Sequence, residues 1–174
     1  GNSTCAQFLF DGDYSLFIDG GSGLAAAGRR MGSVTPQKRY HFLITHTHWD
    51  HILGFPMFYP IYDAGNEFMF YASDTSQSTF KKLFYGLSQA DNLPVPSGEL
   101  RAKVRFTSIV PDASFMIEND IKVSTYQLNH QGVTLGYRVE RDGCTACFIT
   151  DNAPIFNGNH LGETMKQRAT LDPK

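Results

Sequence analysis

The sequence predicts a protein of the α/β class, or α+β by some schemes, because short strand-like apolar runs recur with helical segments between groups of them. Turn residues bound most of these runs, as is typical of strands. A length of 174 residues predicts a single domain over 1–174, and 41% hydrophobic with 18% charged residues is typical of a globular protein. No apolar run approaches the roughly 18–20 residues of a membrane helix, so we expect no membrane partner.

The strand predictions rest on alternating or continuous apolar runs that end at turn residues. Asp11-Gly12-Asp13 and Asp142-Gly143 lie between such runs, and each predicts a β-hairpin. Asn119-Asp120 predicts a further turn. The predicted strands are Cys5–Phe10, Tyr14–Ile18, Tyr40–Thr45, Glu67–Ala72, Ala102–Val110, Ser114–Glu118, Ile121–Leu128, Thr134–Arg141 and Cys144–Thr150.

Helices are predicted where apolar residues recur at helical spacing or where a capping residue precedes them. They cover Leu24–Met31, Asp50–Phe55, Thr75 or Ser76 to Leu87, and Leu161–Ala169. Gly20-Gly21-Ser22-Gly23 predicts a tight strand-to-helix turn and not a phosphate loop, because the Lys and Ser/Thr of that motif are missing. The aromatic segment Phe55–Tyr62 predicts a loop that either packs beneath the preceding residues or forms an apolar wall of a substrate pocket.

The most informative stretch is Thr45–His51, where four side chains able to bind a metal lie within six positions after a buried strand. In extended chain, His46 and His48 project to the same face, and imidazole is the commonest zinc ligand. Asp50 and His51 could then face a second ion, roughly 3.5–4 Å from the first. The alternative is a polar loop that is rich in His by chance, although three of the six histidines fall within it.

These residues resemble the H-x-H-x-D-H signature of the metallo-β-lactamase-fold hydrolases. In that family a later strand ends in a third His and the strand after it ends in Asp, as Leu128-Asn129-His130 and Phe148–Asp151 do here. Leu16–Gly21 resembles the family's early strand ending in Asp-Gly. The variant Thr-His-Thr-His-Trp-Asp-His-Ile-x-Gly before a Phe-Pro loop is similar to the tRNase Z and phosphonate-pathway phosphodiesterase branch.

The resemblance implies a four-layer αββα sandwich with metals at one sheet edge. It implies zinc as the cofactor, with two ions and with manganese or iron as alternatives. The ligand set that it implies is His46, His48 and His130 for one ion, Asp50 and His51 for the other, and Asp151 as the bridge. Asp50 and Asp151 are the candidate catalytic residues, and Asp19 is expected to orient a ligand His or the loop.

The implied reaction is hydrolysis of a phosphodiester by a metal-activated water. The expected substrates are small-molecule phosphodiesters or cyclic nucleotides; RNA is not favoured, because the net charge is −2 and no basic arm is visible. One alternative is a thioester or other ester hydrolase of the same fold, since Asp151 disfavours a lactamase. The other is a binding or regulatory module whose second metal site is incomplete. A homo-oligomer is compatible with the sequence.

The family usually carries a first strand before Gly1-Asn2-Ser3 and one more His ligand near its C-terminus, so the chain resembles a family member that lacks both ends. His160 does not match that ligand position, and we expect it at the surface. His41 is expected to pack within its strand, and packing is favoured for Trp49 over substrate stacking.

Three cysteines make no disulfide framework and fit a reducing, cytoplasmic location. Cys144 and Cys147 stand three apart in a predicted strand and so face opposite sides, which is poor geometry for chelating a metal. We therefore expect both to be buried structural residues.

Overall fold

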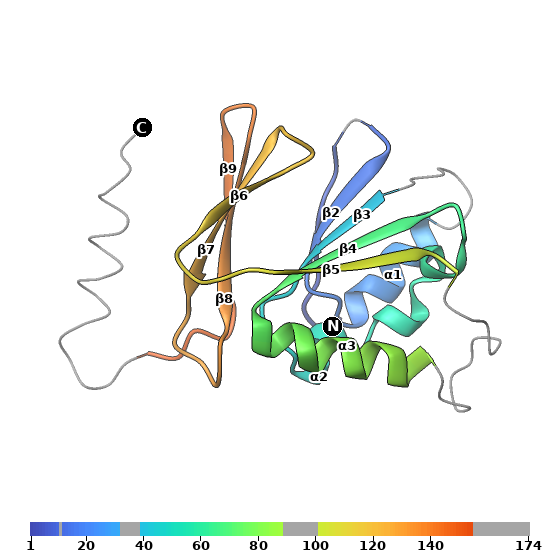
Figure 1. Ribbon diagram of the computed structural model, residues 1–174, viewed down its shortest axis with the longest axis horizontal. Helices are drawn as coiled ribbons and strands as arrows, with labels where there is room; N and C mark the ends of the chain where they lie inside the picture. Colours follow the sequence, from blue (N-terminus) through green and yellow to red (C-terminus); the bar gives the residue numbers. More distant parts are fainter. Residues whose placement is uncertain (11, 32–38, 89–100, 155–174) are drawn as a thin grey trace.

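The computed structural model describes residues 1–10, 12–31, 39–88 and 101–154, which form two β-sheets and a layer of helices (Figure 1). The first sheet has the order β1-β2-β3-β4-β5 and the second has the order β6-β7-β8-β9. The strands are β1 (Ala6–Phe8), β2 (Tyr14–Ile18), β3 (Arg39–Leu43), β4 (Glu67–Ala72), β5 (Lys103–Ser108), β6 (Ser114–Ile117), β7 (Ile121–Gln127), β8 (Leu135–Arg141) and β9 (Cys144–Phe148). The helices are α1 (Ser22–Met31), α2 (Trp49–Ile52) and α3 (Asp74–Ser88), with 3-10 turns η1 (Phe55–Met57) and η2 (Tyr59–Tyr62).

The first sheet brings the ends of three strands to one edge. β1 and β2 form the predicted antiparallel hairpin, and β2, β3, β4 and β5 then run parallel. Parallel neighbours need crossover connections, and α1 and α3 are parts of two of them. Because these strands run in the same direction, the last residues of β2, β3 and β4 lie at the same edge of the sheet. These residues are Ile18, Leu43 and Ala72.

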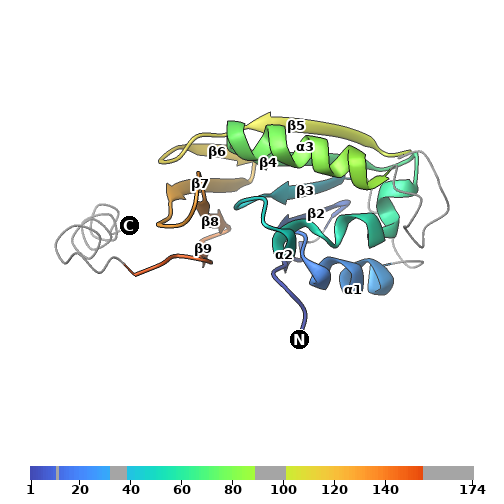
Figure 2. The same cartoon turned by 90° about the horizontal axis from the view of Figure 1, so that it is seen from below.

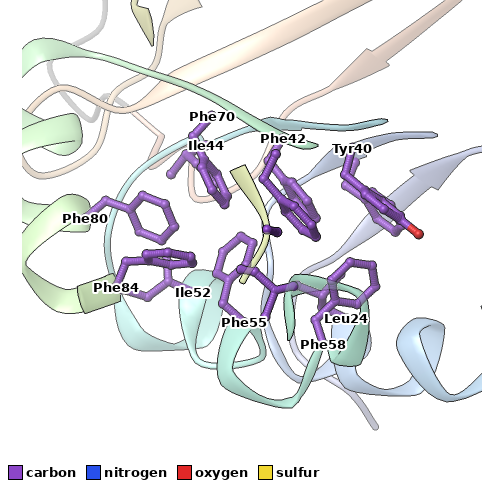
Figure 3. Packing of buried hydrophobic residues seen from close by; sticks show 14 of the residues in the cluster. Leu24, Tyr40, Phe42, Ile44, Ile52, Phe55, Phe58, Phe70, Phe80 and Phe84 are labelled. Atoms are coloured by element: carbon purple, nitrogen blue, oxygen red, sulfur yellow. The ribbon is translucent and has the colours of Figure 1, made fainter. Parts of the chain in front are cut away.

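An aromatic core fills the space between the helices and the first sheet (Figure 3). Phe55 lies with its ring centroid 4.9 Å from that of Phe42 and 5.1 Å from that of Phe80. Phe55 and Phe58 are fully buried, so the predicted loop 55–62 consists largely of two 3-10 turns that pack in the core. This packing fixes the floor beneath the His-rich loop.

A second apolar cluster joins the two sheets face to face. Alternate residues of β7 and β8, such as Ile121, Val123 and Val139, belong to it, as the two-residue period of a strand predicts. The Tyr137 hydroxyl donates to the Ile44 carbonyl at 2.7 Å, and the Leu135 amide donates to the Thr45 carbonyl at 3.0 Å. The second sheet is thus tied to the chain immediately before the His-rich loop.

The helices α1, α2 and α3 all lie on the side of the first sheet away from the second sheet (Figures 1 and 2). Within the residues described, one helical layer and two sheets form three of the predicted four layers, and the predicted helix at 161–169 lies outside them. No helix in this part of the chain is long and apolar enough to cross a membrane.

The prediction that Cys144 and Cys147 are buried is wrong. Both thiols are free and exposed. They lie on β9, the edge strand of the second sheet, and every residue from Cys144 to Cys147 is exposed. The pattern of the sequence predicted the strand, but its place at the edge of the sheet depends on tertiary structure.

Candidate metal centre

Glycines hold the His-rich loop against the end of β2. A Cβ atom on Gly21 would lie 2.1 Å from the Asp50 carbonyl oxygen, and one on Gly54 would lie 2.1 Å from the Gly21 carbonyl oxygen. The Gly20 amide donates to the His51 carbonyl at 2.6 Å. The predicted tight turn at Gly20-Gly21 is confirmed, and it needs glycine because backbone approaches backbone there.

Asp19 follows β2 and is fully buried beneath the loop. Its carboxylate accepts hydrogen bonds from the Thr45 amide at 2.8 Å and from the Thr45 hydroxyl at 2.9 Å. Its Oδ2 atom is also 2.8 Å from His51 Nδ1. A φ of 59° at Asp19 is in the left-handed region, which Asp tolerates better than most residues. Asp19 therefore orients both the loop backbone and one imidazole, as expected from the sequence.

Thr45 was not among the residues singled out in the sequence, although it fixes the orientation of His46. Its hydroxyl has one proton, which it donates to Asp19. It must therefore accept the hydrogen bond from His46 Nδ1, 3.0 Å away. His46 then presents the lone pair of Nε2 to the opposite side. The signal in the sequence was a hydroxyl residue directly before the first His of the motif.

Three imidazoles converge at the edge of the sheets. His46 Nε2 lies 3.0 Å from His48 Nδ1, and His130 Nε2 lies 3.3 Å from the same His48 atom. His46 and His48 come from the loop after β3, whereas His130 comes from the loop after β7. Together with Asp151 they offer four ligand atoms that all lie within 4.8 Å of one another. β3 ends at Leu43, so the predicted strand Tyr40–Thr45 is two residues too long at its C-terminal end.

Asp151 joins this cluster to His51. Its Oδ2 atom lies 3.3 Å from His46 Nε2 and 2.8 Å from His51 Nε2. Asp50 Oδ2 lies 3.4 Å from the same His51 atom. Asp151 follows β9 and takes a φ of 53°, so a left-handed residue turns the chain here as it does at Asp19. The structure thus brings all six predicted ligand residues to one edge.

The Nε2 atom of His51 fits a bound cation. This atom is buried and has no hydrogen-bond partner within the residues described, although two carboxylates lie beside it. Because His51 Nδ1 is engaged by Asp19, its Nε2 carries a lone pair when the ring is neutral. A lone pair facing carboxylates is repulsive, and a metal ion between them removes that repulsion. Imidazole and carboxylate ligands together suit zinc, manganese or iron.

The pKa values of the two buried imidazoles shift in opposite directions. Burial, with His51 and His48 close by, lowers the pKa of His46 to about 4 and keeps its ring neutral. Burial also lowers the pKa of His51, but the carboxylates of Asp19, Asp50 and Asp151 together outweigh this effect, and the net pKa of His51 is raised. Burial raises the pKa of Asp19 against the hydrogen bonds that it accepts. A metal that binds His51 must therefore compete with a proton.

Three further residues from the sequence analysis lie outside this cluster. His41 is buried between the sheets, with its Nε2 atom 2.9 Å from Glu118 Oε1, so its predicted packing is confirmed. The prediction that Trp49 serves packing is wrong, because 58% of its surface is exposed. His160 lies outside the described residues.

The comparisons with known proteins agree with this architecture. The chain is 26% identical over 177 residues to Ribonuclease Z of Haloarcula marismortui. The aligned region covers 94% of this chain and 53% of that protein. The chain therefore spans about half the length of this curated relative. The crystal structure of human tRNase Z, short form, is similar with a TM-score of 0.61 and 15% identity over 86% of this chain and 65% of that chain. Unliganded yeast PDE1 gives a TM-score of 0.62 and 13% identity over 97% of this chain and 66% of that chain.

The similarity to these two solved structures shows the fold, whereas the assignment to a family is based on the match of the sequence to a family model. Residues 16–171, most of the chain, match the family described as beta-lactamase superfamily domain. The matched segment contains all six residues of the candidate metal centre. The chain has the metallo-β-lactamase fold and belongs to the beta-lactamase superfamily domain family.

Proposed function

We propose that this chain is a metal-dependent phosphodiesterase with a centre for two zinc ions. In this proposal His46, His48 and His130 hold one ion, and Asp50 and His51 hold the other. Asp151 lies between the two groups and binds both ions. The observation that carries the proposal is the position of Asp151 Oδ2, which is 3.3 Å from His46 Nε2 and 2.8 Å from His51 Nε2.

The arrangement of protons around the centre supports metal binding over a hydrogen-bonded polar cluster. His46 and His51 each use Nδ1 toward Thr45 or Asp19 and so direct an unprotonated Nε2 toward Asp151 when the rings are neutral. Two neutral rings offer that carboxylate no proton, so a metal ion makes such a group favourable in competition with a proton on His51, whose pKa is raised. Ligand histidines whose other nitrogen is held in this way are typical of protein metal sites.

Divalent metals would lower the pKa of a water and polarise the phosphoryl oxygen. The residues of the chain have separate tasks around them. Asp19 and Thr45 fix the rings of His51 and His46. Asp151 supplies negative charge at the centre. The side chain of Asp50 is 59% exposed, so it is the proposed ligand carboxylate most open to solvent and to an incoming substrate.

A phosphodiester is the substrate class that the sequence supports best. The curated relative is a ribonuclease by name, and the linkages of RNA are phosphodiesters. The motif Thr45–Ile52 before Phe55-Pro56 also resembles the phosphodiesterase branch of the family. A phosphodiester of a nucleotide, such as a cyclic nucleotide, is consistent with both the ribonuclease relative and the phosphodiesterase-like motif. The three free thiols are compatible with the reducing, cytoplasmic location that we propose.

The test is hydrolysis of bis(p-nitrophenyl) phosphate and of a thioester by the zinc-loaded protein. We expect turnover of the phosphodiester and no turnover of the thioester. His48→Ala should abolish the activity while the circular dichroism spectrum is unchanged, because His48 is an exposed loop residue and not part of the core. Asp63→Asn, a change at an exposed residue of the segment after η2, should retain activity. Turnover of the thioester alone, or full activity in His48→Ala, would overturn the proposal.

A further inference from the structure

The rim of the metal centre carries an exposed indole. Trp49 stands between His48 and Asp50, and α2 begins at this residue. Trp49 is 58% exposed, whereas nearby Ile52 and Phe55 are only 1% exposed. An indole is a large apolar group, and an indole exposed to this extent contributes little to packing of the core. Its exposure next to two proposed ligands therefore indicates another role.

The backbone beneath Trp49 is held firmly. The Leu53 amide donates to the Trp49 carbonyl at 2.8 Å, and the His51 amide donates to the His48 carbonyl at 3.0 Å. The close approach of Gly21 to the Asp50 carbonyl fixes the next residue. Adjacent Cα atoms are about 3.8 Å apart, so the indole starts one residue away from a ring of the cluster. The backbone that carries the exposed indole is thus fixed by its own hydrogen bonds.

A second apolar side chain is exposed close in sequence to another proposed ligand. Ile149 is 55% exposed and stands two residues before Asp151. Proposed ligands from two different segments thus have exposed apolar residues as near neighbours in sequence. A phosphodiester whose phosphate lies at the metals extends two ester arms, and one arm can reach such a surface.

We propose that Trp49 stacks against the nucleobase of a nucleotide phosphodiester bound at the metal centre. This inference rests on the proposed phosphodiesterase function and narrows its substrate class. A base is planar, and base stacking on an aromatic side chain is among the strongest sequence-tolerant contacts to single-stranded nucleic acid. A phosphodiester with only glycerol or alkyl arms has no ring to place there. Trp49 is therefore a residue for substrate specificity and takes no part in the chemical step.

The kinetic test compares a diribonucleoside monophosphate with its abasic counterpart, which has the same sugar-phosphate backbone. Trp49→Ala should raise KM for the base-bearing substrate by on the order of tenfold, with a much smaller change for the abasic one. Trp49→Phe should recover part of the loss. Tyr85→Ala, which removes another exposed aromatic ring from α3, serves as the matched control and should leave both KM values unchanged. Zinc content should be equal in all variants.

A binding readout is available because Trp49 is the single tryptophan of the chain. Adenosine monophosphate should quench its fluorescence in the zinc-loaded protein, and ribose 5-phosphate should not. Equal quenching by both compounds, or equal KM changes for both substrates in Trp49→Ala, would overturn the inference and leave the phosphodiesterase intact. Turnover of bis(p-nitrophenyl) phosphate but of neither of these two substrates by the zinc-loaded parent protein would overturn the inference alone, whereas absence of turnover of all three would overturn the proposed function itself.

Discussion

Asp19 and His51 form a buried pair beneath the metal centre, with Oδ2 of one 2.8 Å from Nδ1 of the other and both side chains inaccessible to solvent. The pair connects the end of β2 to α2, two segments that are more than 30 positions apart in sequence. It determines which nitrogen of His51 faces the carboxylates. The geometry of the proposed second metal position thus depends on a residue that would touch no metal.

Asp19→Asn should weaken zinc binding by about 10–100-fold, because an amide cannot hold the Nδ1 proton of His51 as a carboxylate does. The measurement is a zinc titration against a competing chelator. Asp63→Asn, at an exposed position, is the control and should bind zinc like the parent. Unchanged affinity in Asp19→Asn would mean that the orientation of His51 does not matter for the metal.

Asp151→Asn should reduce metal occupancy and turnover together, with a loss of affinity above the roughly 100-fold expected for residues outside the ligand set. A neutral amide cannot balance two cations. The control is Asp142→Asn, because Asp142 takes a φ of 52° in a turn and Asp151 takes a φ of 53°. The competing interpretation is that Asp151 only caps a turn, a role that Asn also fills. Under that interpretation both variants would bind metal alike.

Gly21→Ala should lower the free energy of unfolding by roughly 1–3 kcal/mol, because its Cβ would meet the Asp50 carbonyl oxygen at 2.1 Å and force the backbone to move. It should also impair metal binding, since Asp50 belongs to the loop that moves. Gly86→Ala in α3 is the opposite case. Among the described residues, no atom outside the neighbouring helix backbone lies within 4 Å of its Cβ position, and helix propensity predicts a gain of up to about 1 kcal/mol. Denaturant unfolding of both variants measures the difference, and equal stability would contradict the close packing.

His41 should make the metal-free protein less stable as the pH drops below 6.5, whereas His51, whose pKa is raised, acts in the opposite direction. Burial lowers the pKa of the His41 ring from its ordinary value of 6.5, Arg39 acts in the same direction, and Glu118 opposes them. Tyr71 faces the other ring nitrogen. His41 therefore binds a proton more readily in the unfolded chain than in the folded chain. Its contribution lowers the free energy of unfolding as the pH drops below the pKa of the unfolded state.

The variant His41→Gln isolates this contribution, because Gln forms hydrogen bonds but does not titrate. The slope of unfolding free energy against pH between 6.5 and about 5 should be smaller in the variant than in the parent. His46, whose pKa is also lowered, contributes to the slope in both proteins and leaves their difference unaffected. Parallel pH profiles would show that His41 titrates alike in the folded and unfolded chains.

Much of the fold follows from local patterns. All nine predicted strands are present, because turn residues and apolar alternation define them within a few neighbours. The family signature also anticipated which loops meet at the edge of the sheets, since His130 and Asp151 follow the ends of β7 and β9. The predicted first and last residues of the strands were less accurate than their number and order. β5 begins at Lys103 and ends at Ser108, inside the predicted range Ala102–Val110.

The remaining features depend on contacts between distant segments. Thr45 orients His46 only because β2 delivers Asp19 beneath it. The exposure of Cys147 follows from the position of β9 at a sheet edge, which no local pattern specifies. Trp49 is exposed at the start of α2, although its apolar character favoured packing. Such features require the tertiary arrangement, and they are also the features that bear most on function.

The most direct test of the two-metal account is the zinc content of the purified chain, measured by elemental analysis after zinc loading and dialysis. The parent protein should hold two ions per chain, and His51→Ala should hold one, because His51 Nε2 is a buried nitrogen that has no hydrogen-bond partner among the described residues and lies beside two carboxylates. His41→Gln should hold two, like the parent. A single ion in the parent that His51→Ala leaves unchanged would contradict the dinuclear centre.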